Sequence, residues 1–139
     1  MKYSVVGNNL QLVNIELQPG EKVYGEAGGF VYKSENMKMS ASAKGGLKES
    51  FKRILSSETF FVAEFTPEKG TGIVGFGPRV PGKIKPIVLK KDQTFIAERD
   101  AFLCAEESVA LDIKMVKAAA AIFGGEGIIL QKLQGPGTV

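Results

Sequence analysis

The chain has 139 residues, of which 18 are basic and 15 acidic, with one cysteine and no histidine. The lack of histidine excludes Ser-His-Asp and Cys-His nucleophilic sites and most zinc sites, because all of these need an imidazole. A net charge of +3 is too small to favour nucleic acid by itself.

Short segments of alternating apolar and polar residues follow one another through most of the chain. Val13, Ile15 and Leu17 share one face of the first such segment, and a turn at Gln18–Glu21 ends it. Many short strands at close spacing predict an all-β sandwich or barrel in a single domain, 1–139. The later strands are expected at Val23–Glu26, Phe30–Lys33, Met37–Ser42, Thr59–Phe65, Thr71–Phe76, Ile84–Leu89, Thr94–Glu98, Phe102–Ala105, Val109–Met115 and Ile128–Leu133.

Two segments have a helical pattern instead. In residues 46–55 the apolar side chains recur at helical spacing, with basic residues on the other face. In residues 115–123 four consecutive alanines favour a helix, which Gly124 and Gly125 would end. We therefore expect one or two short helices beside the strands.

An internal repeat is the strongest long-range pattern. Glu26, Phe30 and Met39 recur 72 positions later as Glu98, Phe102 and Leu111. With further blocks in the same order, this predicts two units at about 21–76 and 93–139. The second unit stops where its last strand would begin, so we expect a truncated repeat with an open strand edge that favours association with another chain.

The segments that carry the repeat also resemble a known family. The blocks GEAGGFVY, GGLKESFKRILSSETFF, AFLCAEESV and FGGEGIILQKLQGPGTV are similar to the altered-inheritance-of-mitochondria family numbered twenty-four, a domain of unknown function. The resemblance implies antiparallel sheets wound as a double-stranded β-helix, as in the trp RNA-binding attenuation protein, and members that continue beyond this chain's last residue. The fungal member is linked to mitochondrial inner-membrane organisation. The family has no established catalytic residues, so none are carried over.

Two pairs of glutamates recur with the repeat: Glu26 with Glu98, and Glu58 with Glu126. Paired carboxylates could act as acid and base or bind a hard cation. Catalytic sites are usually single, whereas residues that determine a fold repeat with it. We therefore interpret the four glutamates as acceptors for turn amides and expect no metal or cofactor.

Basic residues gather in two places. Lys48, Lys52 and Arg53 lie on one side of the first expected helix, whereas Arg79, Lys83, Lys85, Lys90 and Lys91 lie in a stretch without acids. They could bind anionic lipid headgroups or nucleic acid, or could be a solvated loop and edge. No aromatic residue alternates with these lysines, which argues against a base-stacking surface for nucleic acid.

The remaining features concern the core and the compartment. Phe60, Phe61, Phe65 and Ile128–Leu130 are most simply core residues, with a small-molecule pocket as the alternative. Cys104 lies in an apolar run and cannot form an internal disulfide.

The chain also lacks a signal-peptide core and any apolar stretch near the ~20 residues that span a bilayer. We expect a cytoplasmic, non-enzymatic scaffold or interaction domain that acts as a homo-oligomer. The alternatives are a peripheral binder of anionic membrane surfaces or nucleic acid through the basic stretch, and a small-ligand or enzymatic barrel that uses the glutamates.

Overall fold

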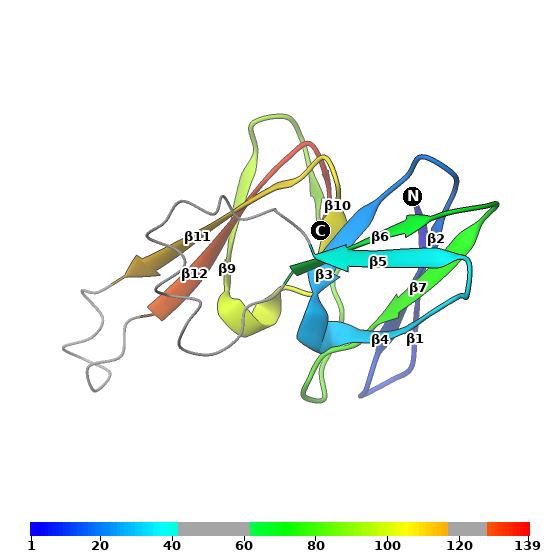
Figure 1. The fold of residues 1–139 in the computed structure, drawn as a ribbon. Helices are drawn as coiled ribbons and strands as arrows, with labels where there is room; N and C mark the ends of the chain where they lie inside the picture. The colour runs from blue at the N-terminus through cyan, green and yellow to red at the C-terminus, as the bar shows by residue number, and fades with distance from the viewer. Residues whose placement is uncertain (42–61, 117–127) are drawn as a thin grey trace.

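A computed structural model describes residues 1–41, 62–116 and 128–139 of the chain. In this part the chain forms antiparallel strands and two short 3-10 turns (Figure 1), which confirms the predicted all-β class. The strands are β1 (Lys2–Val6), β2 (Leu12–Leu17), β3 (Val23–Glu26), β4 (Phe30–Lys33), β5 (Met37–Ala41), β6 (Val62–Pro67), β7 (Gly72–Phe76), β8 (Val88–Leu89), β9 (Thr94–Glu98), β10 (Cys104–Glu106), β11 (Ala110–Val116), β12 (Ile128–Gln134) and β13 (Gly137–Thr138), and the turns are η1 (Ala27–Gly29) and η2 (Arg99–Ala101).

One half of the protein is a β-sandwich, formed by the strands up to β7 together with β10. One sheet has the strand order β1-β2-β7-β4 and the other β10-β3-β6-β5. Alternation along the strands brings one face of each sheet into a common core, which includes Ile15, Phe65 and Phe76. Phe65 stacks on Phe30 at a ring-centroid distance of 5.2 Å and meets Phe76 edge-on at 5.3 Å. These aromatic contacts hold the two sheets together.

The other half packs on the opposite face of the sheet β10-β3-β6-β5, which is therefore the central sheet of the protein. The sheets β11-β12-β9 and β13-β8 contribute Leu89, Leu111 and Leu133 to a second core, together with Tyr24 from β3. Every residue of β3 is buried, because this strand has one core on each side. Figure 1 shows the sandwich on the right and the long hairpin β11–β12 extending to the left.

Strand pairing agrees between positions that the predicted repeat makes equivalent. Met39 pairs with Phe65 in the central sheet, and Leu111 pairs with Leu133 in the three-stranded sheet. The agreement extends to residues that precede the two predicted units: Leu17 pairs with Gly72, and Leu89, 72 positions after Leu17, pairs with Gly137. The turns η1 and η2 also begin 72 positions apart in the sequence.

Some expected elements differ from the structure. Only Val88–Leu89 of the strand expected at Ile84–Leu89 is a strand, because Pro86 has no N–H and the N–H of Ile84 donates to the Gln11 side chain at 2.6 Å. The end of β11 takes up Met115 and Val116, so the second helix cannot begin at 115. The rest of that helix and the helix at 46–55 lie outside the described residues. In the described part, no helix is long and apolar enough to cross a membrane.

Candidate functional sites

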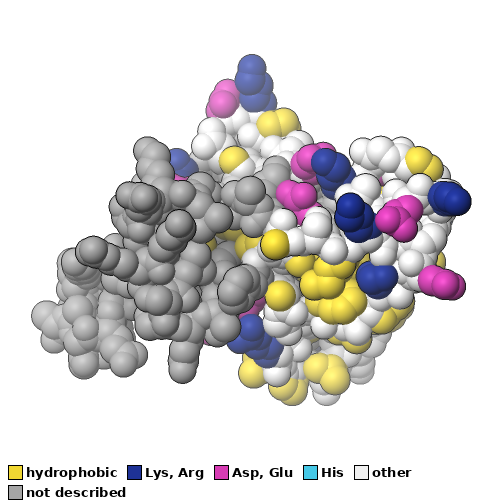
Figure 2. Space-filling model, viewed as in Figure 1, with side chains coloured by type: hydrophobic (Ala, Val, Ile, Leu, Met, Phe, Trp, Pro, Cys, Tyr) yellow, Lys and Arg dark blue, Asp and Glu magenta, His cyan; other side chains and the backbone are white. Residues whose placement is uncertain are grey.

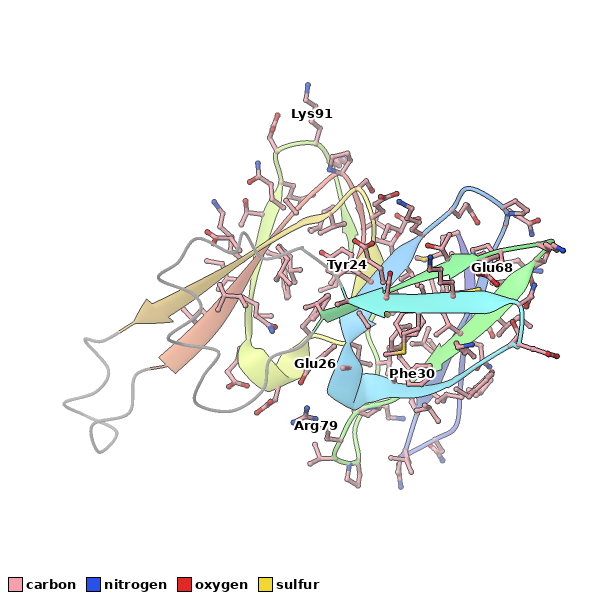
Figure 3. All side chains as sticks on the ribbon, viewed as in Figure 1. Tyr24, Glu26, Phe30, Glu68, Arg79 and Lys91 are labelled. Carbon is pink, nitrogen blue, oxygen red and sulfur yellow. The ribbon has the colours of Figure 1, made fainter. Side chains whose placement is uncertain are left out.

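Glu26 forms an ion pair at the junction between β3 and η1. Its carboxylate Oε1 lies 2.9 Å from Nη2 of Arg79, and the Glu26 side chain is only 8% exposed. The Arg79 guanidinium also covers Gly28: a Cβ there would lie 2.5 Å from Arg79 Cζ. In Figure 3 Arg79 lies below the β3–η1 corner that carries Glu26. A side chain at position 28 would therefore displace the arginine from this place.

The repeat-equivalent Glu98 has a different environment. Its side chain is exposed at the start of η2, where Oε2 accepts a hydrogen bond of 3.3 Å from the N–H of Asp100. Equivalent glutamates therefore receive different partners, an arginine in one half and a turn amide in the other. Glu58 and Glu126 lie outside the described residues, as do Lys48, Lys52 and Arg53.

The basic stretch 79–91 does not form one patch. Arg79 pairs with Glu26, whereas Lys90 and Lys91 lie in the turn between β8 and β9. Figure 3 places Arg79 at the bottom of the molecule and Lys91 at the top. In the coloured part of the face in Figure 2, basic and acidic side chains are interspersed, so the described residues there form no continuous basic surface.

An apolar cavity of about 360 Å³ lies between the two cores. Its wall combines Val13 and Ile15 from the first core with Ala97, Phe102 and Leu133 from the second. Neither Phe65 nor Leu130, which we considered as pocket residues from the sequence, lines it. The sequence showed no signal for this cavity, because its wall residues have the alternation of ordinary core strands.

The segment Lys83–Ile87 borders this cavity and is fixed at both ends. The N–H of Ile84 donates to Gln11 Oε1 at 2.6 Å, and Ile87 exchanges two backbone hydrogen bonds with Val139, at 2.8 and 2.9 Å. Lys83 and Lys85 are exposed residues of this border. The segment thus joins the two halves of the protein over the cavity.

Two groups near the cavity, the half-buried Cys104 and the buried Tyr24, have raised pKa values. Burial raises the pKa of the Cys104 thiol, which lines the cavity, to about 12. Burial also raises the pKa of Tyr24, whose hydroxyl donates to the carbonyl of Val109 at 3.0 Å. A thiol with so high a pKa is a poor nucleophile. In the described ranges, no three His, Cys, Asp or Glu side chains come together as metal ligands would.

The comparisons with known proteins agree with this architecture. Residues 3–139 match the family described as Mitochondrial biogenesis AIM24. The chain belongs to the AIM24 family. The specific fold likeness to the trp RNA-binding attenuation protein stays a prediction.

Two relatives of this AIM24 domain come from Streptococcus pyogenes. An uncharacterised protein of serotype M6 is 28% identical over 136 residues, which cover 92% of this chain and 54% of the relative. A crystal structure of a structural genomics target has a TM-score of 0.74 and 25% identity, covering 99% of this chain and 62% of that one. The chain thus spans about half the length of the curated relative.

Proposed function

We propose that this AIM24 domain is a non-enzymatic cytoplasmic interaction domain that acts as a homo-oligomer. The observation that carries the proposal is the outer face of the sheet β1-β2-β7-β4, which exposes Val6, Val31, Tyr32 and Ile73. We call these four residues the outer apolar face. By strand register these side chains share the face with Asn14 and with the ion pair between Lys2 and Glu16. Exposed apolar side chains on one face favour a protein–protein contact, and tyrosine is enriched in such interfaces.

Part of the outer apolar face is already ordered. The Tyr32 ring lies over Gly75, where a Cβ would be 2.7 Å from Tyr32 Cδ1, and its hydroxyl donates to Asn14 Oδ1 at 2.6 Å. A side chain held in this way loses little conformational entropy when a partner covers it. The face can therefore bind a second copy without first reorganising.

Association through the face is better supported than association through the β4 edge. The register of β4 against β7 shifts between Phe30 and Tyr32. Such a bulge twists an edge and discourages strand addition. We infer that the second copy covers the outer apolar face.

The matching strand registers support the inference that the chain contains two copies of one unit. In the first copy β7 lies between β2 and β4. In the second, β13 pairs with β8, and the N–H of Thr138 donates to Glu106 Oε2 at 2.7 Å. The two copies therefore offer different surfaces, and three of the four residues of the outer apolar face, Val31, Tyr32 and Ile73, lie in the first.

Native molar mass tests the proposal. Light scattering and sedimentation should show a discrete multimer, and Val31→Asp with Ile73→Asp should shift it to monomer. Val88→Asp is the matched control, because Val88 is equally apolar and 70% exposed but lies on β8. A monomer at every concentration, or dissociation by the control as well, would contradict the proposal.

Binding to anionic membranes receives less support from the geometry. The basic residues 79–91 divide between an ion pair, the cavity border and a distant turn. Flotation with anionic liposomes remains the direct measurement for this alternative.

A further inference from the structure

The wall of the cavity between the two cores is suited to an apolar ligand. Side chains such as Ile15, Phe102 and Leu133 form the wall. At about 360 Å³, the cavity is near the lower end of the roughly 300–1,000 Å³ of small-molecule sites. A highly polar ligand such as a nucleotide would leave many of its groups without hydrogen-bond partners there, at a cost in affinity.

The border of the cavity adds positive charge to this wall. Lys83 and Lys85 both line the cavity, with Asp100 as the acidic residue of the lining. Lys83 Nζ has a weak hydrogen bond of 3.5 Å to Asn8 Oδ1. Among the described residues, neither lysine forms an ion pair. Both ammonium groups are therefore available to an anion at the cavity mouth.

We propose that this cavity binds a medium-length carboxylate amphiphile. The apolar chain lies against the wall residues from both cores, and the carboxylate lies at the border beside Lys83 and Lys85. Lysine suits this position, because its stem covers apolar surface while its ammonium group stays in water. The fixed ends of the segment Lys83–Ile87 keep the site formed before the ligand enters, which reduces the ordering cost of binding.

The occupant follows from the combination of wall and border. An inorganic anion would make no use of the apolar wall, and a neutral hydrocarbon would make no use of the lysines. A chain with one terminal negative charge uses both. This site is independent of the outer apolar face, because none of that face's four residues lines the cavity.

A calorimetric titration with hexanoate, octanoate and decanoate, all below micelle formation, tests the apolar part of the proposal. Each added methylene should strengthen binding by roughly fourfold while the chain still fits, from the usual transfer free energy per buried CH₂. Ala101→Trp, at an exposed position of the cavity border, should block all three. Cys104→Leu adds volume at the wall instead and should also weaken binding of all three carboxylates. The same result from two variants at different positions would exclude misfolding of one of them as its cause. Lack of binding by all three, or an affinity independent of chain length, would overturn the proposal.

Comparison of decanoate with 1-decanol tests the charged part. Decanoate should bind up to about tenfold more tightly at low ionic strength, and salt should reduce this difference. Lys83→Gln with Lys85→Gln should remove the difference and leave decanol binding unchanged. Lys90→Gln with Lys91→Gln makes the same change in net charge away from the cavity and should have no effect. An equal loss in both double variants would show a general charge effect and overturn the assignment of the carboxylate to this border.

Discussion

Arg79 Nη2 lies 2.9 Å from Glu26 Oε1 and connects the loop after β7 to the corner between β3 and η1. The same guanidinium covers Gly28. The corner lies beside a strand that is buried on both faces, and the N–H of Gly77 donates to the carbonyl of Gly29 at 2.9 Å nearby. The ion pair therefore has a positioning role at the junction of the two halves, and it compensates a carboxylate that is largely removed from water.

Replacing Arg79 by methionine should lower the free energy of unfolding by about 1–3 kcal/mol, because a buried carboxylate loses its cationic partner. Chemical denaturation monitored by tyrosine fluorescence measures this change. Lys90→Met removes the same charge from an exposed turn and should change stability by less than about 0.5 kcal/mol. Equal effects of the two substitutions would show that the pair contributes no specific stability.

Gly28→Ala should reproduce part of the Arg79→Met effect. A Cβ at position 28 would occupy the place of the guanidinium, which can move because it ends a flexible side chain. The expected cost is roughly 1–2 kcal/mol through the displaced ion pair. In the Arg79→Met background the same alanine should cost far less, so a double-mutant cycle should show coupling between the two positions. Strict additivity of the two changes would refute this account of Gly28.

Gln131 should be replaceable with a gain in stability. It is fully buried in β12, and within the described ranges neither its Nε2 nor its Oε1 has a hydrogen-bond partner. Burial of an unsatisfied amide costs about 1–3 kcal/mol, so Gln131→Met, of similar shape, should raise the free energy of unfolding by about 1 kcal/mol or more. Gln134→Met, at the half-buried end of the same strand, is the control and should have little effect. A loss of stability in Gln131→Met would point to a polar partner for this amide.

The alternation of apolar residues was sufficient to predict most of the strands. The bounds of β3, β4 and β9 agree with the prediction, because turn residues delimit these segments. β1 was missed, since KYSVV is mostly exposed and depends on pairing with β2. Such a strand is set by tertiary contacts rather than by its own pattern.

The candidate sites were less predictable than the strands. Glu26 and Arg79 were each identified, but for different reasons, and their pairing depends on the space that Gly28 leaves. The basic residues of the stretch 79–91 had two interpretations, an anion-binding surface or a solvated loop and edge, and the path of the chain separates them. The cavity arises where the side chains of the two cores leave space between them. This depends on side-chain packing, which the spacing of apolar residues along the sequence does not predict.

The stability of the protein should fall as the pH rises above about 9, because of Cys104. The ordinary pKa of a cysteine thiol is 9.0, and burial raises the pKa of Cys104 in the folded protein to about 12. The folded state therefore keeps a proton that the unfolded state releases, so the stabilisation is complete below pH 9 and is lost as the pH rises toward 12. This group alone lowers the free energy of unfolding by at most about 1.4 kcal/mol per pH unit in that range. Cys104→Ala should show a smaller decrease between neutral pH and about pH 10, measured by urea denaturation. The comparison uses the change of stability with pH in each protein, so any loss of packing in the variant cancels.

Tyr24→Phe should also reduce the fall of stability with pH, but only above the ordinary tyrosine pKa of 10.0, because burial raises the pKa of Tyr24. Parallel pH profiles for the original protein and Cys104→Ala would mean that the thiol meets water in the folded state.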